Sequence, residues 1–181
     1  MILRWPDGLP AGKEVSEMVH FSDWLPTIIA MVAVQLPQGN LPLDGVNVLP
    51  VLRGENGNVQ TRRCWQWNRY TPVGECNAAI RDGRWKLVRP QIPQAMEVYD
   101  LHWLWVSMYG PEHFIHNGII REPEPQRELP APPAPELYDL VADPLEQHDL
   151  AAQYPEMVSK LEQELAAWFI EVETERKANG G

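Results

Sequence analysis

The sequence predicts an α+β chain in which a strand, a helix and a loop come first, and a small antiparallel β-sheet packed against a C-terminal helix follows. Three observations lead to this fold class. An apolar helical run follows Asp23, alternating strand patterns follow a loop rich in Pro and Gly, and an apolar stripe at helical spacing comes near the end of the chain. The 181 residues are enough to bury a core.

The first helix is expected to begin after Asp23. Aspartate is a residue type that caps helix N-termini, and Pro26 falls in the first turn, where its missing N–H is not needed. The helix that follows, up to Val34, is apolar nearly all round. A helix of this kind must be covered on most sides, so we expect it to belong to a larger core than this chain supplies.

A loop rich in Pro and Gly, residues 37–58, marks the expected boundary between residues 1–58 and residues 59–181. The clearest strand signal after it is the hairpin NAAIRDGRWKLVRP, in which we expect Asp82 and Gly83 to form the two-residue turn. That register pairs Ile80 with Trp85, and it pairs Arg81 with Arg84 at the tip.

Residues 90–135 are the least regular part, and we interpret them as an insertion that ends in a stiff arm with six prolines between Pro123 and Pro135. The stretch ELYDL then predicts a strand, DPLE a turn, and Pro155 the start of the closing helix. Its apolar stripe is expected to pack on the sheet and comprises Met157, Val158, Leu161, Leu165, Trp168, Phe169 and Val172.

The net charge of −10 is unevenly distributed and bears on the class of partner. Residues 61–95 hold seven basic and two acidic groups, whereas residues 96–181 hold five basic and seventeen acidic ones. A basic segment inside an acidic chain argues against nucleic-acid binding and favours a small anionic ligand. The alternative is that these arginines merely face solvent on the outer side of a sheet.

No residue pattern predicts a metal site or a membrane span in this chain. Cys64 and Cys76 form no C-x-x-C pair and have no His partner at metal spacing, so they decide neither metal binding nor redox compartment. His113 and His116 lack a third ligand for zinc. The longest apolar run, residues 24–34, is too short to cross a bilayer. The sequence does not indicate a cellular location.

An ordered set of short motifs resembles the C-terminal third of the type I sulfatases, the arylsulfatase-like, formylglycine-dependent branch of the alkaline phosphatase superfamily. Each motif alone is weakly specific, but their order across most of the chain is strongly so. Asp149 departs from the Asn usual in that turn. The motifs are ILRWPDGLPAG, HFSDWLPTI, LDGVNVLPVLRG, AAIRDGRWKLV, ELYDLVADPLEQHDLA and the closing helix with Trp168.

The resemblance implies that residues 1–58 end the large α/β sulfatase domain and that residues 59–181 form the C-terminal subdomain. The implied function is to supply part of the substrate cleft wall, and stability, to a sulfuric ester hydrolase acting on a carbohydrate, aryl or alkyl sulfate. Two alternatives stay open: the tail of a phosphonate or phosphodiester hydrolase of the same superfamily, and a standalone binding module without catalytic activity.

The catalytic groups implied by the resemblance are absent from this chain. The formylglycine motif C-x-[PS]-x-R does not occur, because Cys64 is followed by WQWN and Cys76 by NAAI. The Asp and Asn ligands for calcium, and the Lys and His that contact the sulfate, are also missing. We therefore expect no catalytic residue, metal or cofactor here, and we expect calcium and formylglycine in the missing N-terminal part.

Four residues are candidates for substrate binding, because the small C-terminal sheet of such sulfatases borders the active-site cleft. Trp67 is suited to stacking on a sugar or aryl ring, and Asn68 and Arg69 to bonding hydroxyl or sulfate oxygens. The resemblance places His20 near the cleft side of the large domain. The alternative for each is structural: a core tryptophan, a solvated arginine and a buried, hydrogen-bonded histidine.

Overall fold

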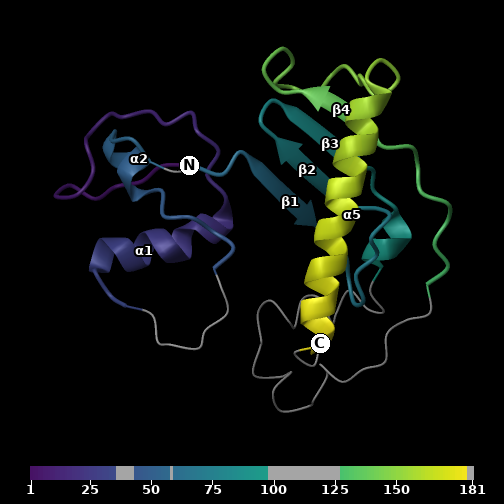
Figure 1. Cartoon of the computed structure of the whole chain (residues 1–181), viewed down its shortest axis with the longest axis horizontal. Helices are drawn as coiled ribbons and strands as arrows, with labels where there is room; N and C mark the ends of the chain where they lie inside the picture. Colours follow the sequence, from purple (N-terminus) through teal and green to yellow (C-terminus); the bar gives the residue numbers. More distant parts are fainter. Residues whose placement is uncertain (36–42, 58, 98–126, 179–181) are drawn as a thin grey trace. The chain divides into compact units, whose positions relative to one another are not determined.

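The computed structural model describes residues 1–35, 43–57, 59–97 and 127–178 (Figure 1). The chain forms two compact units, Met1–Arg63 and Cys64–Gly181. The assignment of residues 1–58 and 59–181 to two parts of a larger protein remains a prediction. Most of the expected insertion, including His113 and His116, lies outside the described residues.

The first unit contains the short 3-10 helix η1 (Phe21–Asp23), helix α1 (Trp24–Val32) and helix α2 (Leu49–Arg53). Pro26 lies in the first turn of α1, as expected. Two details of the prediction were wrong. The described residues before η1 form no strand, because they run as turns and irregular chain. Asp23 stands at the N-terminus of α1, but its side chain makes no capping bond to that helix. The carboxylate turns back into the interior of the unit.

The Asp23 carboxylate is fully buried and joins three segments of the first unit. It accepts hydrogen bonds from the backbone N–H of His20 at 2.8 Å and of Val46 at 2.9 Å, and it forms an ion pair with Arg63. Burial by itself raises the pKa of Asp23, but these three donors outweigh it and lower the pKa. A Cβ on Gly45 would lie 2.1 Å from the Ser22 carbonyl oxygen, so glycine is required beside this site.

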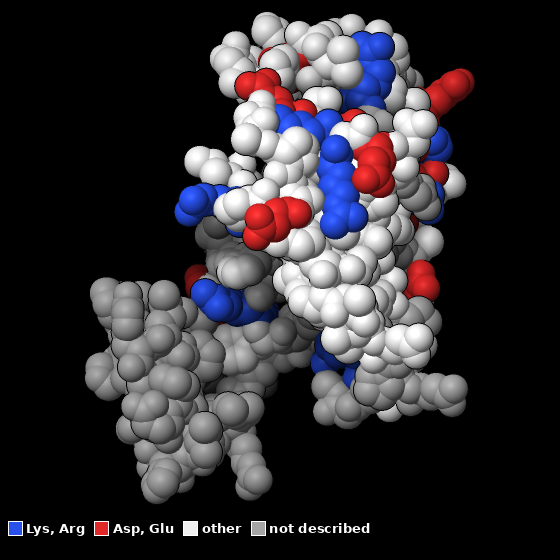
Figure 2. Space-filling model, turned by 90° about the vertical axis from the view of Figure 1, so that its left-hand side faces the viewer, with Lys and Arg blue, Asp and Glu red and all other residues white. Residues whose placement is uncertain are grey.

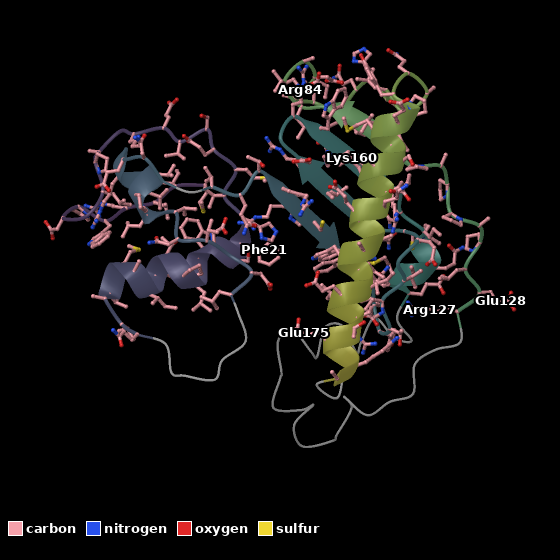
Figure 3. The ribbon with its side chains drawn as sticks, viewed as in Figure 1. Phe21, Arg84, Arg127, Glu128, Lys160 and Glu175 are labelled. Atoms are coloured by element: carbon pink, nitrogen blue, oxygen red, sulfur yellow. The ribbon has the colours of Figure 1, made fainter. Side chains whose placement is uncertain are left out.

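Helix α1 keeps an apolar stripe on its exposed side. Thr27, on the buried side, accepts a hydrogen bond from the Val48 backbone N–H at 3.0 Å and so fixes α1 to the start of α2. The stripe occurs at helical spacing, beginning at Phe21 of η1 just before α1 (Figure 3), and each of its side chains is more than half exposed. Its members are Phe21, Leu25, Ile28 and Val32.

The second unit is built on a four-stranded sheet in the order β1 (Arg62–Gln66), β2 (Ala78–Asp82), β3 (Trp85–Arg89) and β4 (Glu136–Asp139). β3 pairs antiparallel with both β2 and β4. The predicted hairpin exists, but its register was wrong, because Asp82 pairs with Trp85 and the turn consists of Gly83 and Arg84. Gly83, with φ of +58°, takes the left-handed conformation that the turn needs.

Helix α5 (Pro155–Ala178) lies lengthwise across one face of this sheet (Figure 1). The predicted start at Pro155 and most of the predicted stripe are confirmed. Val172 is an exception, since it is exposed while Glu173 is buried and bonded to Arg176. The fully buried side chains between helix and sheet are Ile80, Leu87, Leu137, Leu161 and Leu165.

Basic residues of β3 and of the turn before it pair with acidic residues of the C-terminal part. Arg84 bonds Asp139 with Nε–Oδ1 at 2.8 Å and lowers the pKa of that carboxylate. Lys86 and Arg89 form ion pairs with acidic residues of the turn after β4 and of α5. On the face shown in Figure 2, basic and acidic side chains alternate in small groups. These three basic residues are thus neutralised within the chain.

Replacing Asp23 by Asn should destabilise the first unit by about 3–5 kcal/mol, because the substitution leaves Arg63 buried without its counter-charge. The matched control is Asp82→Asn. The Asp82 carboxylate lies 3.2 Å from the ammonium of Lys160, whose side chain is half exposed, so losing this ion pair should cost at most about 1 kcal/mol. Urea unfolding measures both losses, followed by NMR signals of α1 for Asp23→Asn and of α5 for the control in the second unit. Equal losses in the two variants would contradict a structural role for the buried pair.

Candidate functional site

The loop that follows β1 carries two of the predicted binding residues on its surface. The Trp67 side chain is 62% exposed, and the Arg69 guanidinium lies over its ring, 5.7 Å from the centroid. The structural alternative for Trp67, burial in the core, is therefore excluded for the described chain. An exposed indole with a cation over it combines an apolar surface with positive charge.

The polar interior of this loop is formed by Gln66 and Asn68. The Asn68 carbonyl oxygen accepts the backbone N–H of Val73 at 3.0 Å and a hydrogen bond from the Gln66 amide. Gln66 also donates to the backbone oxygens of Val73 at 2.7 Å and of Cys76 at 2.9 Å. Asn68 thus has a structural function in the loop, and its expected contact with a ligand stays a prediction.

Arg127 holds the same loop from a distant part of the sequence. Its Nη1 donates to the carbonyl oxygens of Arg69 and Ala95, both at 2.9 Å, and its Nη2 donates to that of Thr71 at 3.3 Å. The guanidinium also lies 5.6 Å from the centroid of the Tyr70 ring. In Figure 3 Arg127 lies beside the short helix η2 (Pro93–Met96). Sequence reasoning missed this residue, because no local pattern indicates a contact across 58 positions.

A small apolar cluster packs next to the loop. It contains residues from the segments just before and just after residues 98–126. Cys76, Ile92 and Ala95 are its buried members, and Val73 and Leu129 pack against it. Burial raises the pKa of the Cys76 thiol, and the bond with Asn68 only partly offsets this. Cys76 is accordingly a packing residue of this cluster, and its raised pKa keeps the thiol protonated near neutral pH.

His20 lies in the first unit and is buried beside the Asp23–Arg63 pair. Its Nδ1 lies 2.8 Å from Ser22 Oγ and accepts the Ser22 backbone N–H at 3.3 Å. Burial and the nearby Arg63 charge lower the pKa of His20, and Asp23 offsets this in part. These contacts agree with the structural alternative for His20, and a common site with Trp67 and Arg69 stays a prediction.

The exposed Trp67 and Arg69 side chains are groups suited to binding a ligand. Within the described ranges, no group of three or more His, Cys, Asp or Glu side chains is placed to hold a metal ion. Cys64 and Cys76 stand in sequences that do not match the formylglycine motif. Over the same ranges, no helix has the length and apolar character needed to cross a membrane.

Comparison with known families identifies the chain. Residues 1–104 match the family described as N-sulphoglucosamine sulphohydrolase, C-terminal. The chain belongs to this family. The sequence resemblance to the C-terminal part of the sulfatases, within the alkaline phosphatase superfamily, is thereby confirmed.

Named relatives are similar to this chain over more residues than the sulphohydrolase family match covers. An ulvan-active sulfatase of Formosa agariphila is 27% identical over 177 residues, which cover 93% of this chain and 32% of that protein. A steryl-sulfatase of Mus musculus is 25% identical over 159 residues, covering 84% of this chain and 22% of that protein. The chain spans a third or less of the length of these relatives.

A solved structure supports the fold of this sulphohydrolase family member. It is described as a complex with its substrate D-glucosamine-2-N,6-O-disulfate, and the match covers 98% of this chain and 28% of the solved chain, with a TM-score of 0.51 and 20% identity. At that identity the likeness concerns the fold alone. It agrees with the α+β class, the small sheet and the covering C-terminal helix predicted from the sequence.

The neutral state of His20 is testable by its titration. A folded pKa below the ordinary 6.5 means that the unfolded chain takes up this proton at higher pH than the folded chain does. The stability linked to neutral His20 is thus complete above pH 6.5 and decreases as the pH falls from 6.5 through the folded pKa. NMR titration of the His20 ring protons should give a midpoint below 6.5, and a midpoint at or above 6.5 would contradict the assignment.

Proposed function

We propose that this chain is the C-terminal part of a sulfatase that acts on sulfated carbohydrates, and that the loop with Trp67 and Arg69 contacts the sugar bearing the sulfate. The observation that carries the proposal is an exposed indole paired with a guanidinium, on an internally braced loop, in a member of a sulphohydrolase family. The substrate named for the solved relative, D-glucosamine-2-N,6-O-disulfate, is of this chemical class.

The chemistry of the two side chains suits such a ligand. The face of a sugar ring carries C–H groups that pack on an indole, and a guanidinium donates two parallel hydrogen bonds to sulfate oxygens. Trp67 would stack on the ring and Arg69 would bond the sulfate or a neighbouring hydroxyl group. Both side chains lie in the second unit, so the proposal does not depend on how the two units are arranged.

Hydrolysis itself would take place in a part of the protein outside this chain. Sulfatases of this type use a formylglycine nucleophile and calcium, and the described residues hold neither the motif nor a cluster of metal ligands. The role of this chain would be binding and stability. We therefore expect the chain by itself to be catalytically incomplete.

The alternatives receive less support. The two curated relatives described above are named sulfatases, which favours sulfuric ester hydrolysis over a phosphonate or phosphodiester substrate. A standalone binding module would need to cover its own apolar surfaces. The exposed stripe of α1 favours a chain that packs against a further part of a sulfatase. The relatives' lengths favour the same conclusion, because this chain spans a third or less of each of them.

The binding proposal is tested by titrating the 181-residue chain with D-glucosamine-2-N,6-O-disulfate and following the backbone amide signals of residues 66–71 by NMR, since these signals exist in every variant. We expect saturable binding that weakens about tenfold in Trp67→Ala and in Arg69→Ala, because each removes a direct contact. Arg81→Ala, on the neighbouring hairpin, is the matched control and should bind like the wild type. Unsulfated D-glucosamine should bind more weakly. Equal binding by Arg69→Ala and Arg81→Ala would contradict the proposal.

The assignment to a larger protein is tested by the stripe of α1. We expect the isolated chain to bind an apolar fluorescent dye, and the double variant Leu25→Gln/Ile28→Gln to lose most of this signal. The control variant Val141→Gln/Ile170→Gln removes two exposed apolar side chains from other elements and should retain it. The same dye signal in both double variants would favour the standalone module.

A further inference from the structure

We infer that Arg127 is the positioning residue of the Trp67–Arg69 loop, an inference that rests on the function proposed above. The Arg127 guanidinium is directed to the backbone of the loop, where it donates to the carbonyl oxygens of Arg69 and Thr71. The residue that presents the positive charge to the ligand is therefore itself held by a second arginine.

The backbone of Arg69 is held on both sides. Its N–H donates to the Ala95 carbonyl oxygen at 3.1 Å, and its own carbonyl oxygen accepts from Arg127 at 2.9 Å. Arg127 also donates to Ala95 at 2.9 Å, so the same carbonyl of η2 serves both residues. Fixing this backbone reduces the conformational entropy that Arg69 would lose on binding a ligand.

The backbone of Tyr70, the next residue, is also stabilised by Arg127. Tyr70 has a φ of +54°, in the left-handed region that residues with a Cβ seldom adopt. The Arg127 guanidinium lies over its ring, and the hydrogen bonds to Arg69 and Thr71 flank it in the sequence. Contacts on three successive residues hold the loop in this conformation, which would otherwise relax.

Arg127 is itself placed by packing as well as by polar contacts. Leu129, two positions later, packs against the cluster of Cys76, Ile92 and Ala95. The guanidinium suits its task because its N–H donors diverge in one plane and reach several acceptors at once. A lysine ammonium is a point charge on a flexible stem, so it does not reproduce this arrangement.

A test without ligand isolates the positioning role. In Arg127→Met we expect faster amide hydrogen exchange at Arg69 and a shifted Trp67 indole N–H signal, while the amides of α5 keep their wild-type exchange rates. Arg81→Met is the matched control and should change none of these signals. Unchanged signals of Trp67 and Arg69 in Arg127→Met would overturn the inference, whether or not the sugar binds.

A test with ligand links positioning to binding. With D-glucosamine-2-N,6-O-disulfate as the probe, Arg127→Met should weaken binding about tenfold, comparable to the loss of one hydrogen bond to a charged group. Arg127→Lys should recover only part of the affinity, and full recovery would show that charge suffices and would overturn the inference. Failure of the wild-type chain to bind the probe would refute the proposed function, and the ligand-free test would still decide the role of Arg127.

Discussion

The packing of α5 on the sheet is the contact on which the second unit depends. A single four-stranded sheet exposes two faces, and a sheet this small is stable only when one face is covered. Leu161 and Leu165 cover it by inserting between Ile80, Leu87 and Leu137, and all five side chains are fully buried. The strands, the turns and the loop after β1 therefore keep their positions because one helix closes the core.

Electrostatics reinforces this packing and leaves the candidate site distinct. Arg84, Lys86 and Arg89 pair with carboxylates from β4, the turn after it and α5, so the basic segment and the acidic C-terminal part neutralise each other. Arg69 differs from these three, because the contact of its guanidinium within the described ranges is with the Trp67 indole. A guanidinium that lies over an aromatic ring can donate hydrogen bonds to a ligand without first breaking an ion pair, so binding costs less free energy.

The sequence predicted what depends on local patterns and missed what depends on distant partners. Pro26, the hairpin, the strand in ELYDL and the start of α5 at Pro155 follow from turn chemistry and periodicity, and the structure confirms them. The hairpin register was wrong because Gly83 takes the left-handed conformation and Arg84 bonds Asp139 of the next strand, a contact that no two-strand argument contains.

In the candidate site, too, local features could be predicted from the sequence and contacts with distant segments could not. The exposed Trp67 and its neighbour Arg69 were predicted from residue type, whereas the structural tasks of Asn68 and Arg127 were not, because they consist of bonds to backbone groups of other segments. Asp23 was predicted from its position as a helix cap. Its burial against Arg63 depends on a partner 40 residues away, which its local sequence does not indicate.

The hydrogen bond from Arg127 to Ala95 has a consequence for the evolution of this chain. It joins the residues on either side of the segment 98–126, so the ends of that segment are closed within the second unit independently of what lies between them. Since each doubling of loop length adds only about 0.6 kcal/mol to the cost of closure, the segment is free to change in length and composition. A change in the length of this segment should therefore alter the free energy of unfolding of the second unit only slightly.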